Sequence, residues 1–248
     1  MSATTTAAAS LARAANATEL LRPLRYPRLR RLLGKALHLS RTWQTRRRYD
    51  AYALEFVRGV PVVVTPGVFN PQLLRTGAYF AAQLTAELIA PGAEVLDLGT
   101  GSGICALIAA AYARRVVAVD ISQAAVRCAA ANALLNRLEQ RIEVRHGDLF
   151  APVLGESFDV VLFNPPFFKG VPAGELDQAW RSTDVPQRFA AGLRAHLKPA
   201  GRAYLLLSSF GETAVFVDEL VRQRFAIGLQ AERQFINERL SLLTIRPA

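Results

Sequence analysis

The feature of this sequence that most constrains its fold is a regular alternation of apolar runs and amphipathic segments along residues 94–245. Short β-branched runs predict buried strands, and the segments between them carry apolar residues at helical spacing. The predicted strands are Glu94–Leu98, Arg115–Val119, Ile142–Arg145, Phe158–Phe163, Ala203–Leu207 and Leu240–Ile245. The predicted helices are Ser102–Tyr112, Ser122–Leu135, Pro186–Leu197 and Glu212–Arg224. This alternation predicts an α/β protein whose mostly parallel sheet has helices on both faces.

Two further elements are expected ahead of this alternation. Val60–Val64 is predicted to form a short strand, and Thr76–Ile89 has the apolar spacing of an amphipathic helix. Later in the chain, Pro199-Ala200-Gly201 predicts a turn between the helix expected over Pro186–Leu197 and the strand expected over Ala203–Leu207.

The positive charge of the chain is concentrated near its start. Residues 1–50 hold 11 Lys and Arg against two acids, a balance of +9, whereas residues 51–248 hold 19 against 18. Residues 1–18, mostly Ala, Thr and Ser, are expected to form a disordered tail. Residues 19–54 are expected to form a basic helical extension, because four leucines recur there at helical spacing. Such an arm suits an anionic partner such as RNA or a ribosome; alternatively, its leucines pack it onto the body.

The sequence argues against a membrane-spanning protein and against one held together by a metal site or disulfides. No apolar run approaches the roughly 20 residues that span a bilayer, so no membrane segment is expected. Cys105 and Cys128 stand in no metal-ligand spacing, so neither a metal site nor a disulfide framework is expected. Buried, reduced thiols suit a cytoplasmic protein.

A glycine-rich run follows the first strand of the alternation. It reads Asp97-Leu98-Gly99-Thr100-Gly101-Ser102-Gly103 and leads into the next predicted helix. Glycines permit a tight turn and a close ligand, and the helix N-terminus offers unpaired N–H groups. A dinucleotide-binding loop would place its third glycine one residue later, where Ile104 stands. An acid such as Asp97 suits a ligand ammonium group better than a pyrophosphate.

Two more carboxylates end the next two predicted strands. Asp120 follows the glycines by about 20 residues, the spacing of a carboxylate that binds ribose hydroxyls. Asp148 can accept a hydrogen bond from an adenine amine. Singly, either acid could instead cap a helix or hold a turn. Three acids at successive strand ends beside a glycine loop indicate a nucleoside ligand that carries an ammonium group.

The fourth strand of the alternation ends in Asn164-Pro165-Pro166-Phe167. Two prolines fix the backbone and remove two N–H donors, which holds the asparagine stiffly at the sheet edge. The Asn164 side chain and the Pro165 carbonyl can accept hydrogen bonds from an amide or aromatic amine, and Phe167 can stack on that planar group. The run therefore predicts chemistry on a planar nitrogen, with no strong base required.

Together these motifs resemble the class I S-adenosylmethionine (SAM)-dependent methyltransferases, over residues 55–248. The resemblance implies a Rossmann-like, seven-stranded, mostly parallel sheet, with SAM as cofactor and S-adenosylhomocysteine as product. It places Asp97, Gly99, Thr100, Gly101 and Gly103 around the methionyl part of SAM. It places Asp120 and Ile121 at the ribose and Asp148 and Leu149 at the adenine, and it adds Thr76 and Asn164 to the cofactor site.

The Asn-Pro-Pro-Phe run itself is similar to the signature of N-methyltransferases. These include the HemK/PrmC-type enzymes that methylate a glutamine side chain of release factors, and the DNA adenine and rRNA guanine enzymes. Residues 66–71, followed by Thr76-Gly77, resemble a segment found in both the HemK-like and the rRNA-guanine groups. Residues 237–241 resemble the HemK-like group, whereas residues 167–170 are closer to the rRNA-guanine group. A protein glutamine is the first expected acceptor, and a base of rRNA or another nucleic acid is the alternative. Methylation of a small molecule and SAM binding without catalysis are the remaining hypotheses. The long connection over residues 168–184 is expected to contact substrate or act as a lid.

Overall fold

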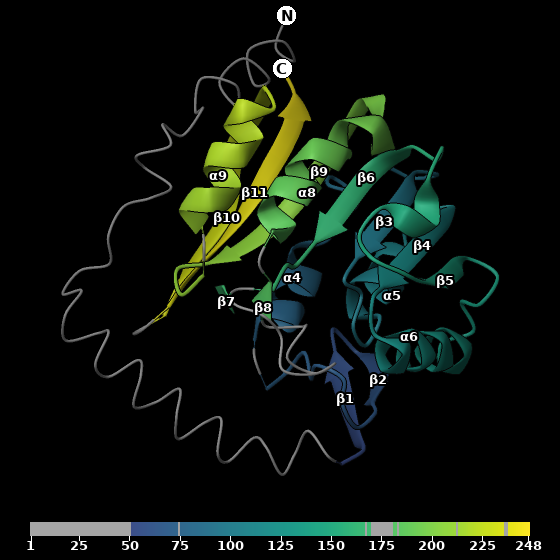
Figure 1. Cartoon of the computed structure of the whole chain (residues 1–248). Helices are drawn as coiled ribbons and strands as arrows, with labels where there is room; N and C mark the ends of the chain where they lie inside the picture. The colour runs from purple at the N-terminus through teal and green to yellow at the C-terminus, as the bar shows by residue number, and fades with distance from the viewer. Residues whose placement is uncertain are drawn as a thin grey trace, which may run out of the picture.

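The computed structural model describes residues 51–73, 75–166, 168–169, 181–182, 184–211, 213–235 and 238–248 (Figure 1). The sequence predictions for residues 1–50, and the role predicted for Phe167, lie outside these described residues.

A seven-stranded sheet forms the centre of the protein. Its spatial order is β10 (Phe225–Gln234), β11 (Arg239–Pro247), β9 (Leu197–Ser208), β6 (Phe158–Phe163), β3 (Glu94–Leu98), β4 (Arg115–Asp120) and β5 (Ile142–His146). The strands from β9 to β5 run parallel, and β11 is antiparallel to both of its neighbours. The order reverses between β3 and β6, and open α/β sheets bind ligands beyond the strand ends at such a point.

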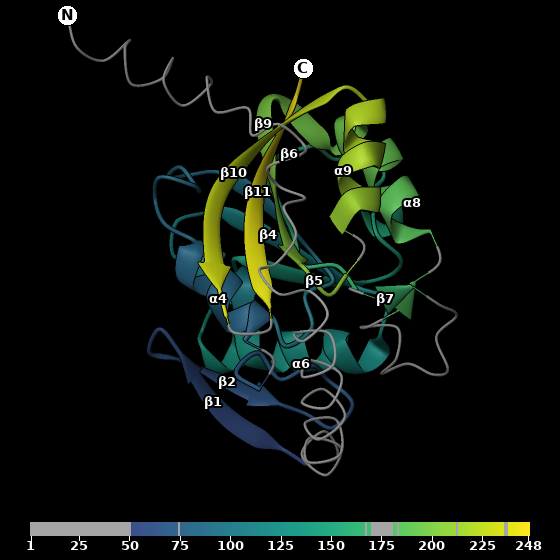
Figure 2. The ribbon, with the colours of Figure 1, turned by 90° about the vertical axis from the view of Figure 1, so that its left-hand side faces the viewer.

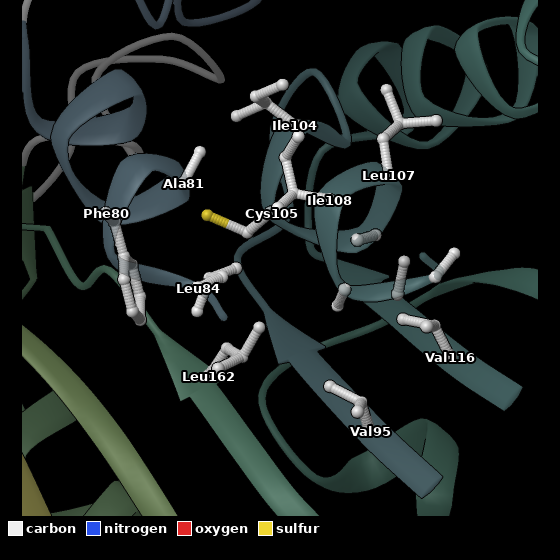
Figure 3. Packing of buried hydrophobic residues seen from close by; sticks show 14 of the residues in the cluster. Phe80, Ala81, Leu84, Val95, Ile104, Cys105, Leu107, Ile108, Val116 and Leu162 are labelled. Carbon is white, nitrogen blue, oxygen red and sulfur yellow. The ribbon is translucent and has the colours of Figure 1, made fainter. Parts of the chain in front are cut away.

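Helices cover both faces of this sheet (Figure 1). One face packs against α4 (Thr76–Gln83), α5 (Ile104–Ala109) and α6 (Gln123–Leu135), and the other against α8 (Val185–Leu193) and α9 (Thr213–Arg222). Successive residues of a strand point to opposite faces, so Val95 belongs to the first apolar cluster and Leu96 to the second. In Figure 3, Val95 and Leu162 of the sheet face Leu84 and Cys105 of the first cluster. Strands buried on both sides explain the continuous apolar runs of the sequence.

A β-hairpin of β1 (Ala53–Val57) and β2 (Val60–Val64) lies beside α6, apart from the central sheet (Figure 2). Asn132 of α6 holds it in place. The Asn132 Oδ1 accepts from the Val63 N–H at 2.8 Å, and its Nδ2 donates to the carbonyls of Val63 at 2.7 Å and Ser102 at 2.9 Å. The fully buried amide therefore ties the hairpin, α6 and the glycine loop together.

The structure corrects several predicted boundaries. The helix expected over 76–89 ends at Gln83, and the one expected over 102–112 spans only Ile104–Ala109. The helix expected over 186–197 is α8 followed by a short 3₁₀ turn, Arg194–His196. Strand β10 was not predicted; this edge strand buries only Phe225, and its other residues are exposed or partly exposed.

The turn predicted at Pro199-Ala200-Gly201 is wrong, because these residues continue strand β9. The register between β6 and β9 shifts at this point. A Cβ atom on Gly201 would lie 2.8 Å from the Phe158 carbonyl oxygen, so glycine serves a close backbone approach here.

The remaining short elements are the 3₁₀ turn Ala151–Val153 and the strand pair β7 (Phe168–Lys169) and β8 (Arg181–Ser182). In the described part of the chain, none of the helices has the length and apolar character needed to cross a membrane.

Candidate active site

A cavity of about 300 Å³ opens at the carboxyl ends of the parallel strands. Residues from β3, β4 and β6, and from the segments that follow β5 and precede α4, contribute to its walls. Most of the residues predicted from the sequence line it: Asp97, Gly99, Thr100, Gly101, Asp120, Ile121, Asp148, Leu149, Asn164, Pro165 and Pro166. The sheet thus brings together groups that are spread over 70 residues of sequence.

Two of the predicted cofactor residues do not line the cavity. Gly103 begins α5 with a φ of 85°, and a Cβ there would lie 3.2 Å from the Cα of Ala129. Its glycine character therefore permits close packing of α6 behind the loop. Thr76 is buried at the start of α4, and its neighbour Gly77 contributes to the cavity wall instead.

The loop between β3 and α5 owes its shape to glycines with left-handed backbone angles. The φ of Gly99 is 62° and that of Gly101 is 58°, which other residues rarely adopt. The Thr100 N–H donates to the Val119 carbonyl at 3.0 Å, so the loop is fastened to the end of β4.

Asp97 lies at the end of β3 with only 3% of its surface exposed. Its Oδ2 accepts a hydrogen bond from the Thr100 hydroxyl at 2.6 Å. Burial raises the pKa of Asp97 to about 7, and the neighbouring Asp120 adds to this rise. A cationic ligand group beside Asp97 would favour its ionised form.

Asp120 ends β4 and is held by two backbone donors. Gly101 N–H donates to its Oδ2 at 2.8 Å, and Ser122 N–H donates to its Oδ1 at 2.9 Å. Burial raises the pKa of Asp120, and these donors oppose the rise. Each oxygen keeps a second acceptor site for a ligand hydroxyl. Ile121, 44% exposed, follows directly, and its carbonyl contacts His146 Nε2 at 2.9 Å.

Asp148 and Leu149 follow β5, the neighbour of β4, and line the cavity there. Leu149 has a φ of 47°, an unusual angle for a branched residue that marks a tight turn. The Asp148 Oδ2 accepts a hydrogen bond from Arg188 Nη1 at 2.5 Å. Arg188 and Asp184 also line the cavity. Asp184 ends the connection that was expected to contact substrate, whereas Arg188 was not expected in the site. Both residues stand at the start of α8, about 40 residues after Asp148 in the sequence.

Asn164 follows β6 at the opposite wall of the cavity. Within the described residues its Oδ1 is buried and has no hydrogen-bond partner, which also holds for Thr76 Oγ1. Buried acceptors in proteins are nearly always satisfied, so the Asn164 oxygen is prepared for a donor that a ligand would bring. Pro165 is buried and Pro166 partly buried beside it, as expected for a rigid turn.

Cys105 of α5 also contributes to the wall. Burial raises the pKa of its thiol well above the ordinary value, so the group stays protonated and unreactive. Both cysteines are free and buried. The described residues contain no group of three or more His, Cys, Asp or Glu side chains that could hold a metal ion.

Solved methyltransferase structures share this architecture. The T. thermophilus 16S rRNA N2 G1207 methyltransferase, solved with AdoMet and guanosine, aligns with a TM-score of 0.57 and 23% sequence identity. The alignment covers 80% of this chain and 50% of that chain. The fold is therefore that of the Rossmann-like methyltransferases.

Two curated relatives are similar in sequence. The release factor glutamine methyltransferase of Moorella thermoacetica is 32% identical over 216 residues, 78% of this chain and 75% of the relative. The ribosomal RNA small subunit methyltransferase C of Alcanivorax borkumensis is 34% identical over 143 residues, 57% of this chain and 40% of the relative. The chain spans 40% to 61% of the length of four of the curated relatives that it matches. The methyltransferase small domain matches residues 59–231, and the protein belongs to this family.

Proposed function

We propose that this protein transfers a methyl group from SAM to a planar nitrogen, and that the nitrogen belongs to a glutamine side chain of a protein. The observation that carries the proposal is the Asn164 Oδ1 at the wall of the strand-end cavity, which is buried and has no hydrogen-bond partner among the described residues. An acceptor without a donor is costly to bury, and it suits a substrate that brings N–H groups.

The cavity walls fit the three parts of SAM. Asp97 would face the methionyl ammonium group, because its buried carboxyl lies beside the glycine loop. Asp120 would accept from the ribose hydroxyls, and the Asp148–Leu149 turn would enclose the adenine. A cavity of about 300 Å³ lies within the range of small-ligand pockets.

SAM, when bound, supplies an electrophilic methyl group and becomes S-adenosylhomocysteine. The lone pair of an amide or aromatic amine is delocalised, which makes the nitrogen a poor nucleophile. Asn164 Oδ1 and the Pro165 carbonyl would accept its N–H hydrogens and return electron density to the nitrogen. The proline pair holds these acceptors rigidly, so positioning supplies much of the rate. The nitrogen releases one proton to solvent once the new N–C bond has formed, and Asn164 orients the N–H without acting as a base.

The names of the relatives favour two acceptors. A glutamine side chain is supported by the Moorella thermoacetica relative, of which the chain covers 75%. A base of rRNA is the second candidate, supported by the Alcanivorax borkumensis relative at 34% identity. Both acceptors present the same planar N–H chemistry to Asn164.

Labelling a cell lysate separates these acceptors. The protein is incubated with lysate and methyl-labelled SAM, and portions are then treated with ribonuclease, deoxyribonuclease or protease. We expect protease alone to remove the acid-insoluble label. Loss of the label to ribonuclease would instead assign an RNA acceptor, and loss to deoxyribonuclease a DNA acceptor. The absence of any acid-insoluble label would contradict a macromolecular substrate.

The charge of residues 1–50 supports an anionic partner, such as a ribosome that carries the substrate. Deleting residues 1–50 should lower labelling of the macromolecule and leave SAM affinity unchanged. Unchanged labelling would remove the arm from substrate recruitment. The two free, buried thiols support a reducing, cytoplasmic compartment for this reaction.

A further inference from the structure

Arg188 joins two acids at one side of the cavity. Its Nη1 donates to Asp148 Oδ2 at 2.5 Å, and its Nε lies 3.1 Å from Asp184 Oδ1. Asp148 follows β5, whereas Asp184 and Arg188 stand one turn apart at the start of α8. All three residues line the cavity together with Leu149 and Val185.

We propose that Arg188 is a positioning residue for the adenine of SAM. It fixes the Asp148 carboxylate through one oxygen, so that the other oxygen faces the exocyclic adenine amine. Arg188 itself touches the ligand only through this acid. The inference rests on the proposed function, because it assumes that the cavity binds SAM.

The geometry explains why a second residue is needed. The Asp148 side chain is 41% exposed and stands on the turn after β5, and Arg188 donates a hydrogen bond to its Oδ2. A guanidinium is planar and presents its donors in a fixed fork, so it can hold two carboxylates at set directions. Asp184 completes the arrangement, since an acid at the N-terminal end of α8 is favoured by the helix dipole.

The charge of the cluster favours an amine over a carbonyl. Two carboxylates and one guanidinium leave a net charge of −1 beside Leu149. A hydrogen-bond donor such as the adenine amine is stabilised there, whereas the carbonyl oxygen of hypoxanthine is repelled. The cluster would therefore favour S-adenosylhomocysteine over S-inosylhomocysteine, in which a carbonyl replaces the amine and N1 carries a hydrogen.

This cluster differs from an ordinary surface ion pair, and the chain offers a matched comparison. Arg222 pairs with Glu219 on α9 at 2.9 Å, with side chains 68% and 11% exposed, and neither residue lines the cavity. Substituting Arg222 therefore serves as a control: it removes an Arg–carboxylate pair without changing the cavity that would hold the adenine.

Calorimetry on the full chain tests the inference. The dissociation constants of S-adenosylhomocysteine and S-inosylhomocysteine are measured for the wild type, Arg188→Met, Arg188→Lys and Arg222→Met. We expect the wild type to prefer the adenine ligand by more than about tenfold. Arg188→Met should reduce this preference below about threefold, Arg188→Lys should give an intermediate value, and Arg222→Met should match the wild type.

Other outcomes overturn the inference. If Arg188→Met raises the dissociation constants of both ligands by the same factor, Arg188 contributes to the shape of the site but does not position the acid that recognises the adenine amine. If the preference is unchanged, the adenine is recognised without it. If Arg188→Met fails to fold, the value for Arg188→Lys decides. If the wild type binds neither ligand, the proposed function itself fails, which is a distinguishable result.

Discussion

The buried carboxyl of Asp97 gives ligand affinity a specific dependence on pH. Its pKa is about 7 in the free protein because burial disfavours the charged form. A ligand ammonium group requires the ionised carboxylate, so the acid must release its proton on binding at lower pH. With a pKa of about 7, roughly one molecule in ten is ionised at pH 6 and roughly nine in ten at pH 8. The affinity for S-adenosylhomocysteine should therefore rise about tenfold over this interval.

The same acid affects folding stability with a definite sign. Its pKa is raised from 3.8, the value expected for the unfolded chain, so the folded state binds a proton that the unfolded state releases. The contribution of Asp97 to the free energy of unfolding should fall as pH rises from about 4 to about 7. A shift of this size corresponds to about 4 kcal/mol.

Calorimetry at pH 6, 7 and 8 measures the effect on binding. The control ligand is 5′-methylthioadenosine, which lacks the amino acid part and should bind with little change over this interval. Asp97→Asn should bind S-adenosylhomocysteine weakly and with a flatter pH profile. Equal pH profiles for the two ligands in the wild type would refute the role assigned to Asp97.

Two further substitutions test other parts of the account. Asp120→Ala removes the acceptor for the ribose hydroxyls and should weaken S-adenosylhomocysteine binding by about tenfold or more in calorimetry; unchanged affinity would contradict its role. Asn132→Ala removes three hydrogen bonds that join the hairpin to the glycine loop, and should lower the free energy of unfolding in urea by about 3–5 kcal/mol. Asn136→Ala is its control, because the Asn136 amide is only partly buried and donates to two carbonyls, and it should cost about 1–2 kcal/mol. Equal losses for the two variants would argue against a special role of Asn132.

The sequence was most informative where local chemistry is strict. Glycines with left-handed angles, a proline pair and acids at strand ends can each be recognised from a few neighbouring residues. Parallel pairing of the strands then brings them to one edge of the sheet. For this reason the sequence predicts a common site for Asp97, Asp120 and Asn164, and all three line the cavity.

Features that depend on distant contacts could not be predicted in this way. Strand β10 has one neighbour in the sheet and buries only Phe225, so its place in the sheet depends on its pairing with β11. Arg188 meets Asp148 across 40 residues of sequence, and nothing near either residue indicates the other. Gly103 matched the glycine pattern, but its tight contact with Ala129 is a packing constraint behind the loop.

The most direct test of the account is Asn164→Ala, measured for binding and for methyl transfer in parallel. The substitution removes the unpartnered acceptor at the wall of the cavity and leaves Asp97 and Asp120 in place. We predict nearly unchanged affinity for SAM and a loss of at least about a hundredfold in methyl transfer to the acceptor identified by labelling. Wild-type methyl transfer by this variant would contradict the claim that Asn164 prepares a planar nitrogen for attack.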